Sequence, residues 1–339
     1  MKRHRVVQVG CGAMSKAWID IAKTRDDLEI VGLVDLDRAA AERVAHRHEL
    51  PESVVFDSLQ EALAIASPDI VFDITVPSAH YEVTMAALRA GCHVFGEKPI
   101  SDSIERAREM VAAAKASDRL YAIMQNRRYM PQIRSFHAGL ESGLIGEIST
   151  VNADFYLGPH FGGFRDAMES PLLVDMAIHT FDQARFISGA DPVAVYCHEF
   201  NPRGSWYKGS ASATCVFEMT EGIVFTYRGS WCAEGLNTAW ESEWRVQGSK
   251  GSAIWDGKSQ PVGEVVSAPE GFIYQHEKAT MPEVHLPLTH HAGCVDAMMT
   301  ALHEDREPET VCTDNIKSLA MVFGAVESAR KKQRVEIRI

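Results

Sequence analysis

Short apolar runs alternate with amphipathic stretches through about the first 125 residues of the chain. The apolar runs are rich in valine and isoleucine and predict strands over 5–9, 29–34, 53–56, 70–74, 93–95 and 120–124. The stretches between them carry apolar residues at helical spacing and predict helices over 13–22, 38–48, 59–66, 80–90 and 104–116. This alternation is typical of βαβ units, so we predict a parallel sheet covered by helices on both faces.

The pattern changes after about residue 150, where aromatic and β-branched runs follow one another with turns between them. The runs 214–219 and 222–227 predict strands of a mostly antiparallel sheet. Two helical patterns, 292–304 and 314–331, close the chain. At about 150 residues per domain, 339 residues fit two domains. We therefore predict an α/β domain followed by an α+β domain, joined between residues 120 and 130.

Composition and charge narrow the classes of partner. The hydrophobic fraction of 46% and the charged fraction of 24% are those of an ordinary soluble globular protein. The net charge is −12, from 34 basic and 46 acidic side chains, and the basic residues are scattered. We expect neither a nucleic-acid partner nor binding to an anionic membrane, because both require a basic surface.

We also expect neither a membrane span nor an export signal. No apolar stretch approaches the ~20 residues that cross a bilayer, and the basic start of the chain leads into only Val6 and Val7 before Gln8. The seven cysteines are an odd number without a Cys-x-x-Cys pair, so neither a disulfide framework nor a thiolate zinc site is indicated. A cytoplasmic location fits best.

A glycine-rich turn, Gly10-Cys11-Gly12-Ala13-Met14-Ser15, follows the first predicted strand and opens a helix. In a dinucleotide-binding turn the first glycine makes the bend, the second lets the backbone approach the pyrophosphate, and the helix offers free N–H groups. Ser15 stands where a third glycine or alanine usually permits close packing, and serine is small enough to fit. A bare strand-turn-helix is the alternative. The residues predicted to bind the dinucleotide are Gly10, Gly12, Ala13 and Met14.

Asp35 and Arg38 bear on which dinucleotide binds. Asp35 ends the second predicted strand, 23 residues after Gly12, near the spacing at which a carboxylate accepts hydrogen bonds from the adenosine ribose. Its charge would repel a 2′-phosphate, so we expect NAD rather than NADP, although Arg38 could partly offset the repulsion. The alternative role of Asp35 is to cap the next helix.

Several motifs together carry a resemblance to a known family. Gly96-Glu97-Lys98-Pro99 follows the fifth predicted strand, where the nicotinamide end of such a site lies, although an exposed Lys98 paired with Glu97 would be an ordinary surface feature. With Asn126-Arg127-Arg128-Tyr129, Leu144-Ile145-Gly146-Glu147-Ile148 and the stretch 172–182, this motif resembles the Gfo/Idh/MocA family, the glucose-fructose oxidoreductase and inositol dehydrogenase group. The resemblance runs from Val6 to the last helix.

The resemblance implies an N-terminal Rossmann domain over 1–124 and a C-terminal α+β domain over 125–339, whose mostly antiparallel open sheet serves substrate binding and oligomerisation. It implies an NAD(P)-dependent dehydrogenase of sugars or polyols that forms a homodimer or homotetramer. By position, Lys98 resembles the catalytic lysine, and Asp175 and His179 resemble the Asp-x-x-x-His pair. Ser170-Pro171 replaces a frequent Gly-Gly pair, so the approach to the sugar site is expected to differ. The further cofactor contacts that it implies are Thr75, Pro77, His80, Glu97, Lys98 and Asn126.

The residue types also make chemical sense without the family. Oxidation of an alcohol requires a base near the hydroxyl, and histidine is the natural candidate near neutral pH. On a helix, Asp175 and His179 would share one face, so the carboxylate could fix the imidazole tautomer or bind a neighbouring hydroxyl. Lys98 could stabilise charge on the same oxygen. Alone, such an Asp and His are more often an ordinary helix pair; the glycine turn and Lys98 favour the catalytic interpretation.

Other polar and aromatic side chains could line a sugar site, although each could equally be structural. The predicted substrate contacts are Arg127, Arg128, His160, Arg165, Trp231 and Asn237, with Trp240 as a further candidate. The glycine-rich segment 158–164 could be a mobile cover over the substrate or a plain surface loop. We predict no metal, because Asp175 and His179 supply only two ligands and no third stands at a diagnostic spacing.

The sequence thus predicts NAD-dependent oxidation of a hydroxyl of a sugar, polyol or glycoside, or reduction of the matching ketone. His179 would act as the base, Lys98 would polarise the oxygen, and Asp175 would orient them. Two alternatives stay open: a non-catalytic regulator that binds NAD and sugar, and a glycosidase that uses NAD transiently to acidify a neighbouring carbon.

Overall fold

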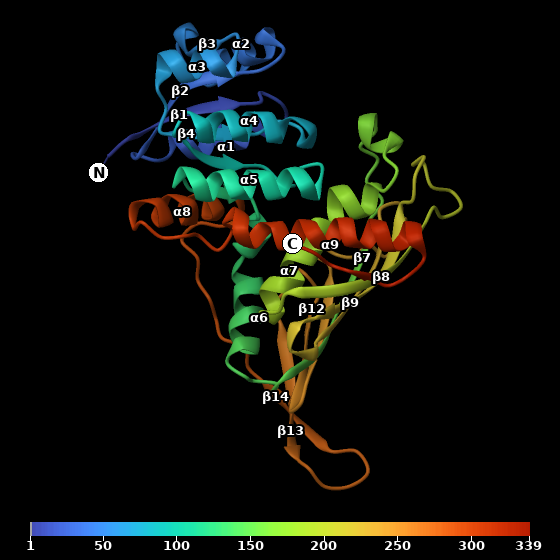
Figure 1. The fold of residues 1–339 in the computed structure, drawn as a ribbon. Helices are drawn as coiled ribbons and strands as arrows, with labels where there is room; N and C mark the ends of the chain where they lie inside the picture. Colours follow the sequence, from blue (N-terminus) through green and yellow to red (C-terminus); the bar gives the residue numbers. More distant parts are fainter. Residues whose placement is uncertain (1) are drawn as a thin grey trace. The chain divides into compact units, whose positions relative to one another are not determined.

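The computed structural model describes residues 2–339, which form two compact units (Figure 1). Unit 1 extends to Asn126 and includes Leu288–Ile316, and unit 2 comprises Arg127–Pro287 and Lys317–Ile339. This division differs from the predicted single boundary after residue 124, because residues 288–316 belong to unit 1. Two contacts join this late segment to the N-terminal residues: Arg25 Nη1 lies 2.6 Å from Asp296 Oδ1, and Ile123 N donates to Thr310 O at 2.9 Å.

Unit 1 is built on a six-stranded sheet in the order β3-β2-β1-β4-β5-β6, with every neighbouring pair parallel. The central strands are buried because they are runs of valine, isoleucine and phenylalanine, as a sheet covered on both faces requires. The predicted parallel sheet is confirmed. Its strands are β1 (His4–Val9), β2 (Leu28–Val34), β3 (Val55–Phe56), β4 (Ile70–Asp73), β5 (His93–Gly96) and β6 (Tyr121–Ile123).

Helices connect these strands. Helix α4 contacts α3 and α5, and α1 contacts α8; right-handed crossovers place α1 and α2 on one face of the sheet and α3 to α5 on the other. The helices of unit 1 are α1 (Ser15–Lys23), α2 (Arg38–Arg47), α3 (Leu59–Ala66), α4 (Pro77–Arg89), α5 (Ile104–Ser117) and α8 (His290–His303). None of the helices in residues 2–339 combines the length and the apolar character that a membrane crossing requires.

Local signals explain where these elements begin. Helix α3 has its predicted limits because Ser58 Oγ accepts from Glu61 N at 3.2 Å and caps the first turn. Helix α4 begins at Pro77, before the predicted residue 80, because proline fits the first turn of a helix. The predicted strand 53–56 is shorter than expected, because Glu52–Val54 forms a 3-10 turn and only Val55–Phe56 pairs with β2.

Unit 2 contains a nine-stranded sheet in the order β14-β13-β12-β11-β7-β10-β9-β8-β15. Neighbouring strands are antiparallel except β10 and β7, so the predicted mostly antiparallel sheet is confirmed. Its strands are β7 (Ile148–Tyr156), β8 (Pro192–Phe200), β9 (Ser212–Met219), β10 (Val224–Ser230), β11 (Glu243–Gly248), β12 (Gly251–Trp255), β13 (Val262–Ala268), β14 (Gln275–Ala279) and β15 (Val335–Glu336).

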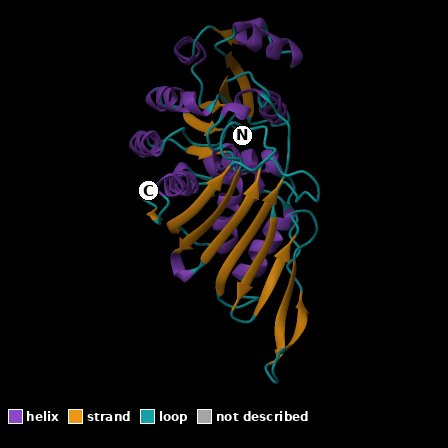
Figure 2. Cartoon of the chain, turned by 90° about the vertical axis from the view of Figure 1, so that its right-hand side faces the viewer, coloured by secondary structure: helices purple, strands orange, loops and turns teal. Residues whose placement is uncertain are grey.

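Helices lie behind this sheet and leave its other face open (Figure 2). On the covered face, Phe181 packs edge-on against Phe217 and Tyr227, with ring centroids 4.9 and 5.2 Å apart. Tyr196 and Val216 are exposed on the open face, because side chains alternate along β8 and β9. The helices are α6 (Pro131–Glu141), α7 (Ile178–Ser188) and α9 (Cys312–Lys331), of which α9 begins in unit 1.

Candidate functional site

The glycine-rich turn lies between β1 and α1. Gly10 has a φ of +99°, and a Cβ on it would lie 2.3 Å from Ile74 O, so only glycine fits there. A Cβ on Gly12 would meet no atom within 4 Å, because Gly12 faces open space. Met14 stands at the N-cap position of α1, but no side chain forms a capping hydrogen bond there. Gly12, Ala13 and Met14 are exposed. An uncapped helix start beside exposed backbone fits the pyrophosphate of a dinucleotide.

Asp35 follows β2 and is tied to the glycine-rich turn. Its Oδ2 accepts from Cys11 N at 2.7 Å, and its Oδ1 accepts from Asp37 N at 2.9 Å. The alternative that Asp35 caps the next helix is wrong, because Asp37 caps α2 through Ala39 N at 3.1 Å. Burial, with the Asp35 charge added, raises the pKa of the Cys11 thiol to about 12. The carboxylate is therefore fixed where the first and second strands end, beside a neutral thiol.

Arg38 is exposed and already paired with acidic side chains. Its Nε lies 2.9 Å from Glu42 Oε1, and its Nη1 also contacts Asp57. Both pairings offset the positive charge that a 2′-phosphate would need. The surroundings of Asp35 therefore favour the unphosphorylated ribose of NAD.

A buried cluster that the sequence analysis did not identify lies where β4 ends. Asp73 is completely buried, and its Oδ1 accepts from Thr75 Oγ1 at 2.6 Å and from His80 Nδ1 at 2.9 Å. Its Oδ2 accepts from Thr84 Oγ1 at 3.1 Å. Burial alone would lower the pKa of His80, but the Asp73 carboxylate raises it above its ordinary value. His80, predicted as a cofactor contact, is only 1% exposed, so it holds the loop of Thr75 and Pro77 from within.

Glu97 joins the Lys98 loop to the first helix. Its Oε1 accepts from Trp18 Nε1 at 2.8 Å, and its Oε2 accepts from Lys98 N at 3.3 Å. Lys98 is half-buried rather than an exposed surface lysine, and it follows β5 at the carboxyl edge of the sheet. Ligands of open α/β sheets bind at this edge.

Asn126 follows the last strand of unit 1 and contacts His291, the second residue of α8. Asn126 Nδ2 lies 3.4 Å from His291 Nδ1. Burial lowers the pKa of His291, and the opposing carboxylate of Glu97 does not reverse the shift. A neutral His291 can accept the Asn126 hydrogen bond. His291 carries no local signal of this contact in the sequence, because 165 residues separate it from Asn126.

In unit 2, Asp175 lies in a π-helix, Leu172–Ala177, and His179 lies in the first turn of α7. The pair therefore spans the junction of a π-helix and an α-helix. That the two side chains share one face of a helix stays a prediction. Asp175 Oδ2 accepts from Arg165 Nε at 2.7 Å, and His179 is 8% exposed. Ser170, just before the π-helix, donates to Glu199 Oε2 at 2.9 Å.

The two predicted arginines after Asn126 are buried in different contacts. Arg127 Nη2 lies 3.7 Å from Met176 Sδ, beside Asp175, and its Nη1 donates to the carbonyl of Trp240. Burial lowers the pKa of Arg127 to about 10. Arg128 instead forms a buried ion pair with both carboxylate oxygens of Asp182, each at 2.7 Å. The structure thus places Arg127 against Met176, the residue after Asp175, and Arg128 in the core.

The remaining predicted substrate contacts also divide into two groups. Trp231 is 1% exposed and packs edge-on against Trp240 at 5.7 Å. Asn237 Nδ2 donates to Tyr156 O and Ala233 O, so it holds the loop backbone. His160 lies 2.9 Å from Glu234 through its Nε2, and its ring stacks on Trp206 at 3.8 Å. Arg165 and the exposed Trp240 therefore line the surface near Asp175, whereas Trp231 is buried beside Trp240 and Asn237 serves the loop.

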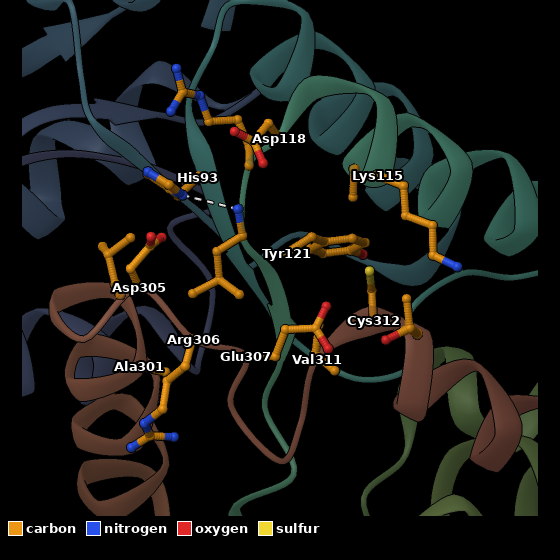
Figure 3. A pocket seen from close by; sticks show the side chains of 15 residues that line it. His93, Lys115, Asp118, Tyr121, Ala301, Asp305, Arg306, Glu307, Val311 and Cys312 are labelled. Atoms are coloured by element: carbon orange, nitrogen blue, oxygen red, sulfur yellow. Dashed lines mark hydrogen bonds between the residues drawn. The ribbon is translucent and has the colours of Figure 1, made fainter.

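A separate hollow of about 370 Å³ lies in unit 1, at the amino ends of β5 and β6 (Figure 3). His93 lines it and accepts from Leu120 N at 3.0 Å, whereas the charged ends of Lys115 and Arg306 point away from it. This hollow is at the sheet edge opposite to Asp35 and Lys98. Among residues 2–339, no group of three or more His, Cys, Asp or Glu side chains is arranged to hold a metal ion.

A parallel sheet with a dinucleotide turn, followed by an open antiparallel sheet, defines the class of two-domain NAD-binding oxidoreductases. Residues 4–125 match the model of the oxidoreductase family with an NAD-binding Rossmann fold, and residues 133–254 match that of the GFO/IDH/MocA C-terminal domain. The chain belongs to the Gfo/Idh/MocA family. It is an NAD-dependent oxidoreductase, and the predicted resemblance and fold are confirmed.

The chain is similar to named relatives over much of its length. 1,5-Anhydro-D-fructose reductase of Ensifer adhaerens is 26% identical over 345 residues, covering 97% of each chain. D-Glucoside 3-dehydrogenase of Escherichia coli (strain K12) is 31% identical over 208 residues, covering 59% of each. A solved oxidoreductase from Agrobacterium radiobacter, in complex with NAD+, L-tartaric acid and magnesium, shares the fold with a TM-score of 0.85, 22% identity and 99% coverage of both chains.

Proposed function

We propose that the protein transfers a hydride between NAD and a carbon that bears a hydroxyl in a sugar, polyol or glycoside. The observation that carries the proposal is the surface around Asp175, whose carboxylate is bound by Arg165 at 2.7 Å beside exposed aromatic rings. A carboxylate and a guanidinium bind hydroxyls, and aromatic rings bind the C–H faces of sugars, so this surface suits a polyhydroxylated ligand.

Each predicted catalytic side chain has a task in that reaction. When bound, NAD supplies the hydride acceptor. His179 takes the hydroxyl proton, because imidazole exchanges protons near neutral pH. Lys98 stabilises the negative charge that develops on the oxygen. Asp175, fixed by Arg165, orients the reacting hydroxyl or the imidazole. In the opposite direction the same groups return the proton to a ketone.

We further propose that NAD is preferred over NADP. Asp35 is fixed by Cys11 N and Asp37 N, and it places a carboxylate where the 2′-phosphate of NADP would lie. Arg38 offers little compensation, since Glu42 and Asp57 already pair with it.

The first experiment mixes the purified protein with NAD and a panel of monosaccharides, polyols and glycosides and follows nicotinamide absorbance. With a substrate in hand, His179→Ala is expected to lower kcat by about 10²–10⁴-fold while NADH fluorescence titration shows unchanged binding. His276→Ala, a change in an exposed histidine of β14, is the matched control. Because His179 is buried, His179→Gln and a thermal unfolding curve separate lost chemistry from lost folding. Undiminished turnover in a folded variant would remove His179 from the mechanism.

The same assay distinguishes the two alternatives. A regulator would bind NADH and show no substrate-dependent absorbance change. A glycosidase that uses NAD transiently would release the leaving group of a glycoside without accumulation of NADH. A dehydrogenase accumulates NADH in proportion to the oxidised product.

We propose that the open face of the unit 2 sheet is where copies of the chain associate into a dimer or tetramer. Tyr196 and Val216 are 49% and 40% exposed there, and apolar side chains on a sheet face favour association. Sedimentation equilibrium with Tyr196→Glu tests this, because a charge on that face should shift the assembly toward monomers.

We also propose a cytoplasmic location. All seven cysteines are free thiols, which supports it.

A further inference from the structure

The surface near Asp175 carries an exposed group of rings, the aromatic rim, formed by Phe161, Phe164 and Trp240. Their exposed fractions are 54%, 63% and 44%. Large aromatic side chains usually bury most of their surface in a folded protein, so three neighbouring rings with about half their surface in water indicate a contact site.

The rim is fixed by buried rings. Phe161 lies 5.9 Å from Trp231 and 6.5 Å from Trp240, measured between ring centroids. Trp231 is buried and also packs against Phe155 at 5.5 Å. Phe161 and Trp240 are therefore held in place from below, so a ligand that covers them finds a prepared surface and loses less entropy on binding.

Two arginines connect the rim to the segment that carries Asp175. The guanidinium carbon of Arg165 lies 5.1 Å from the Phe161 ring centroid and 4.8 Å from that of Phe164. The same guanidinium donates to Asp175 Oδ2 at 2.7 Å. On the other side, Arg127 donates to the Trp240 carbonyl and reaches Met176 Sδ at 3.7 Å. A ligand bound at Asp175 therefore meets the rim directly.

The size and chemistry of the rim exceed what one sugar ring needs. A monosaccharide presents one small C–H face to an aromatic ring, and its hydroxyls need hydrogen-bond partners on the remaining sides. Asp175 and Arg165 can provide such partners, but the rim adds only one polar group, the indole N–H of Trp240, to the apolar surface of its three rings. The phenylalanine rings would remain exposed above a free sugar or a polyol, whereas an aromatic group linked to the sugar would cover them.

We propose that the substrate is a glycoside with an aromatic aglycone, and that Phe161, Phe164 and Trp240 form the aglycone subsite. This inference rests on the proposed function, because it assigns the substrate class of that same site. The sugar part then lies toward Asp175 and His179, and the aglycone lies on the rim.

The test compares pairs of glycosides that differ only in the aglycone. Methyl and phenyl pyranosides of several sugars, in both anomers, are assayed with NAD. For the reactive sugar we expect kcat/KM to be at least about tenfold higher for the phenyl glycoside, which corresponds to about 1.4 kcal/mol. Phe161→Ala combined with Phe164→Ala should bring this ratio close to one, because the double variant removes the surface that only the phenyl group covers. Phe272→Ala, in the exposed hairpin between β13 and β14, is the control for the loss of an exposed phenylalanine and should leave the ratio unchanged.

A second measurement separates failure of the subsite from failure of the proposed function. Quenching of tryptophan fluorescence by 4-nitrophenyl glycosides reports binding without turnover, since Trp231 and Trp240 lie at or below the rim. Equal kcat/KM for the two members of each pair, or oxidation of free sugars and polyols alone, would overturn the subsite and leave the dehydrogenase standing. Binding that the double variant weakens, without turnover of any compound, would support the subsite and overturn the proposed reaction. If no glycoside is either bound or turned over, the subsite is overturned.

Discussion

Asp73→Asn tests the buried cluster beneath the Thr75 loop. The substitution keeps the size of the side chain but removes the charge that holds His80 at 2.9 Å. Loss of that charge-assisted hydrogen bond costs about 1.5–3 kcal/mol, and a new NH2 group facing the donors of Thr75 or Thr84 costs about 1–3 kcal/mol more. We expect a loss of about 3–5 kcal/mol in the free energy of unfolding, a large fraction of the 5–15 kcal/mol that is typical.

The assay is urea unfolding near pH 6 and near pH 9, either side of the imidazole range. Because Asp73 raises the pKa of His80, the ion pair is complete below the ordinary value and is lost as the pH rises through the raised value. The penalty of Asp73→Asn should therefore be larger near pH 6. Asp37→Asn is the matched control, because asparagine caps a helix as well as aspartate and the Asp37–Arg43 pair is exposed. A penalty below about 1 kcal/mol, or one that is equal at both pH values, would refute this account of the cluster.

Three further predictions concern single side chains. Asp35→Ser should lower the ratio of kcat/KM for NAD over NADP, and an unchanged ratio would remove Asp35 from cofactor selection. Arg165→Ala should lower kcat/KM for the sugar substrate by about 10–100-fold, since Asp175 loses its 2.7 Å partner, with NADH affinity unchanged by fluorescence titration. Burial raises the pKa of Glu199 to about 7, so its ionisation destabilises the folded protein as the pH rises from the ordinary glutamate pKa of about 4.5. Glu199→Gln should flatten the fall of the thermal midpoint over that range, and parallel curves for the two proteins would contradict this.

Much of unit 1 could be predicted because its signals are local. A strand of unit 1 is a short apolar run, and a helix start is a capping residue such as Ser58 or a proline such as Pro77. β3 was predicted too long, because a run of apolar residues does not show that only Val55 and Phe56 have a partner strand. The glycine-rich turn was predicted for the same reason that the strands were, since its requirements lie within a few residues.

The parts of the site that the sequence did not show depend on distant contacts or on helix geometry. Nothing near His291 indicates that it meets Asn126. The spacing of Asp175 and His179 is compatible with an α-helix, and the π-helix at Leu172–Ala177 depends on hydrogen-bond register that residue types do not reveal. Asp73 did offer a signal, because a carboxylate that ends an apolar strand needs partners if it is buried. Here those partners are Thr75, His80 and Thr84.

The return of residues 288–316 to unit 1 has a consequence for synthesis and for engineering. The ribosome releases all of Arg127–Pro287 before the segment that carries Asp296 and Thr310, so the Rossmann unit obtains its last contacts only near the end of translation. A chimera made by one junction after residue 124 would separate Arg25 from Asp296 and Ile123 from Thr310. Exchange of the substrate unit between relatives therefore needs two junctions, one near Asn126 and one near Leu288, and a third within α9 if the C-terminal strand is to follow its sheet.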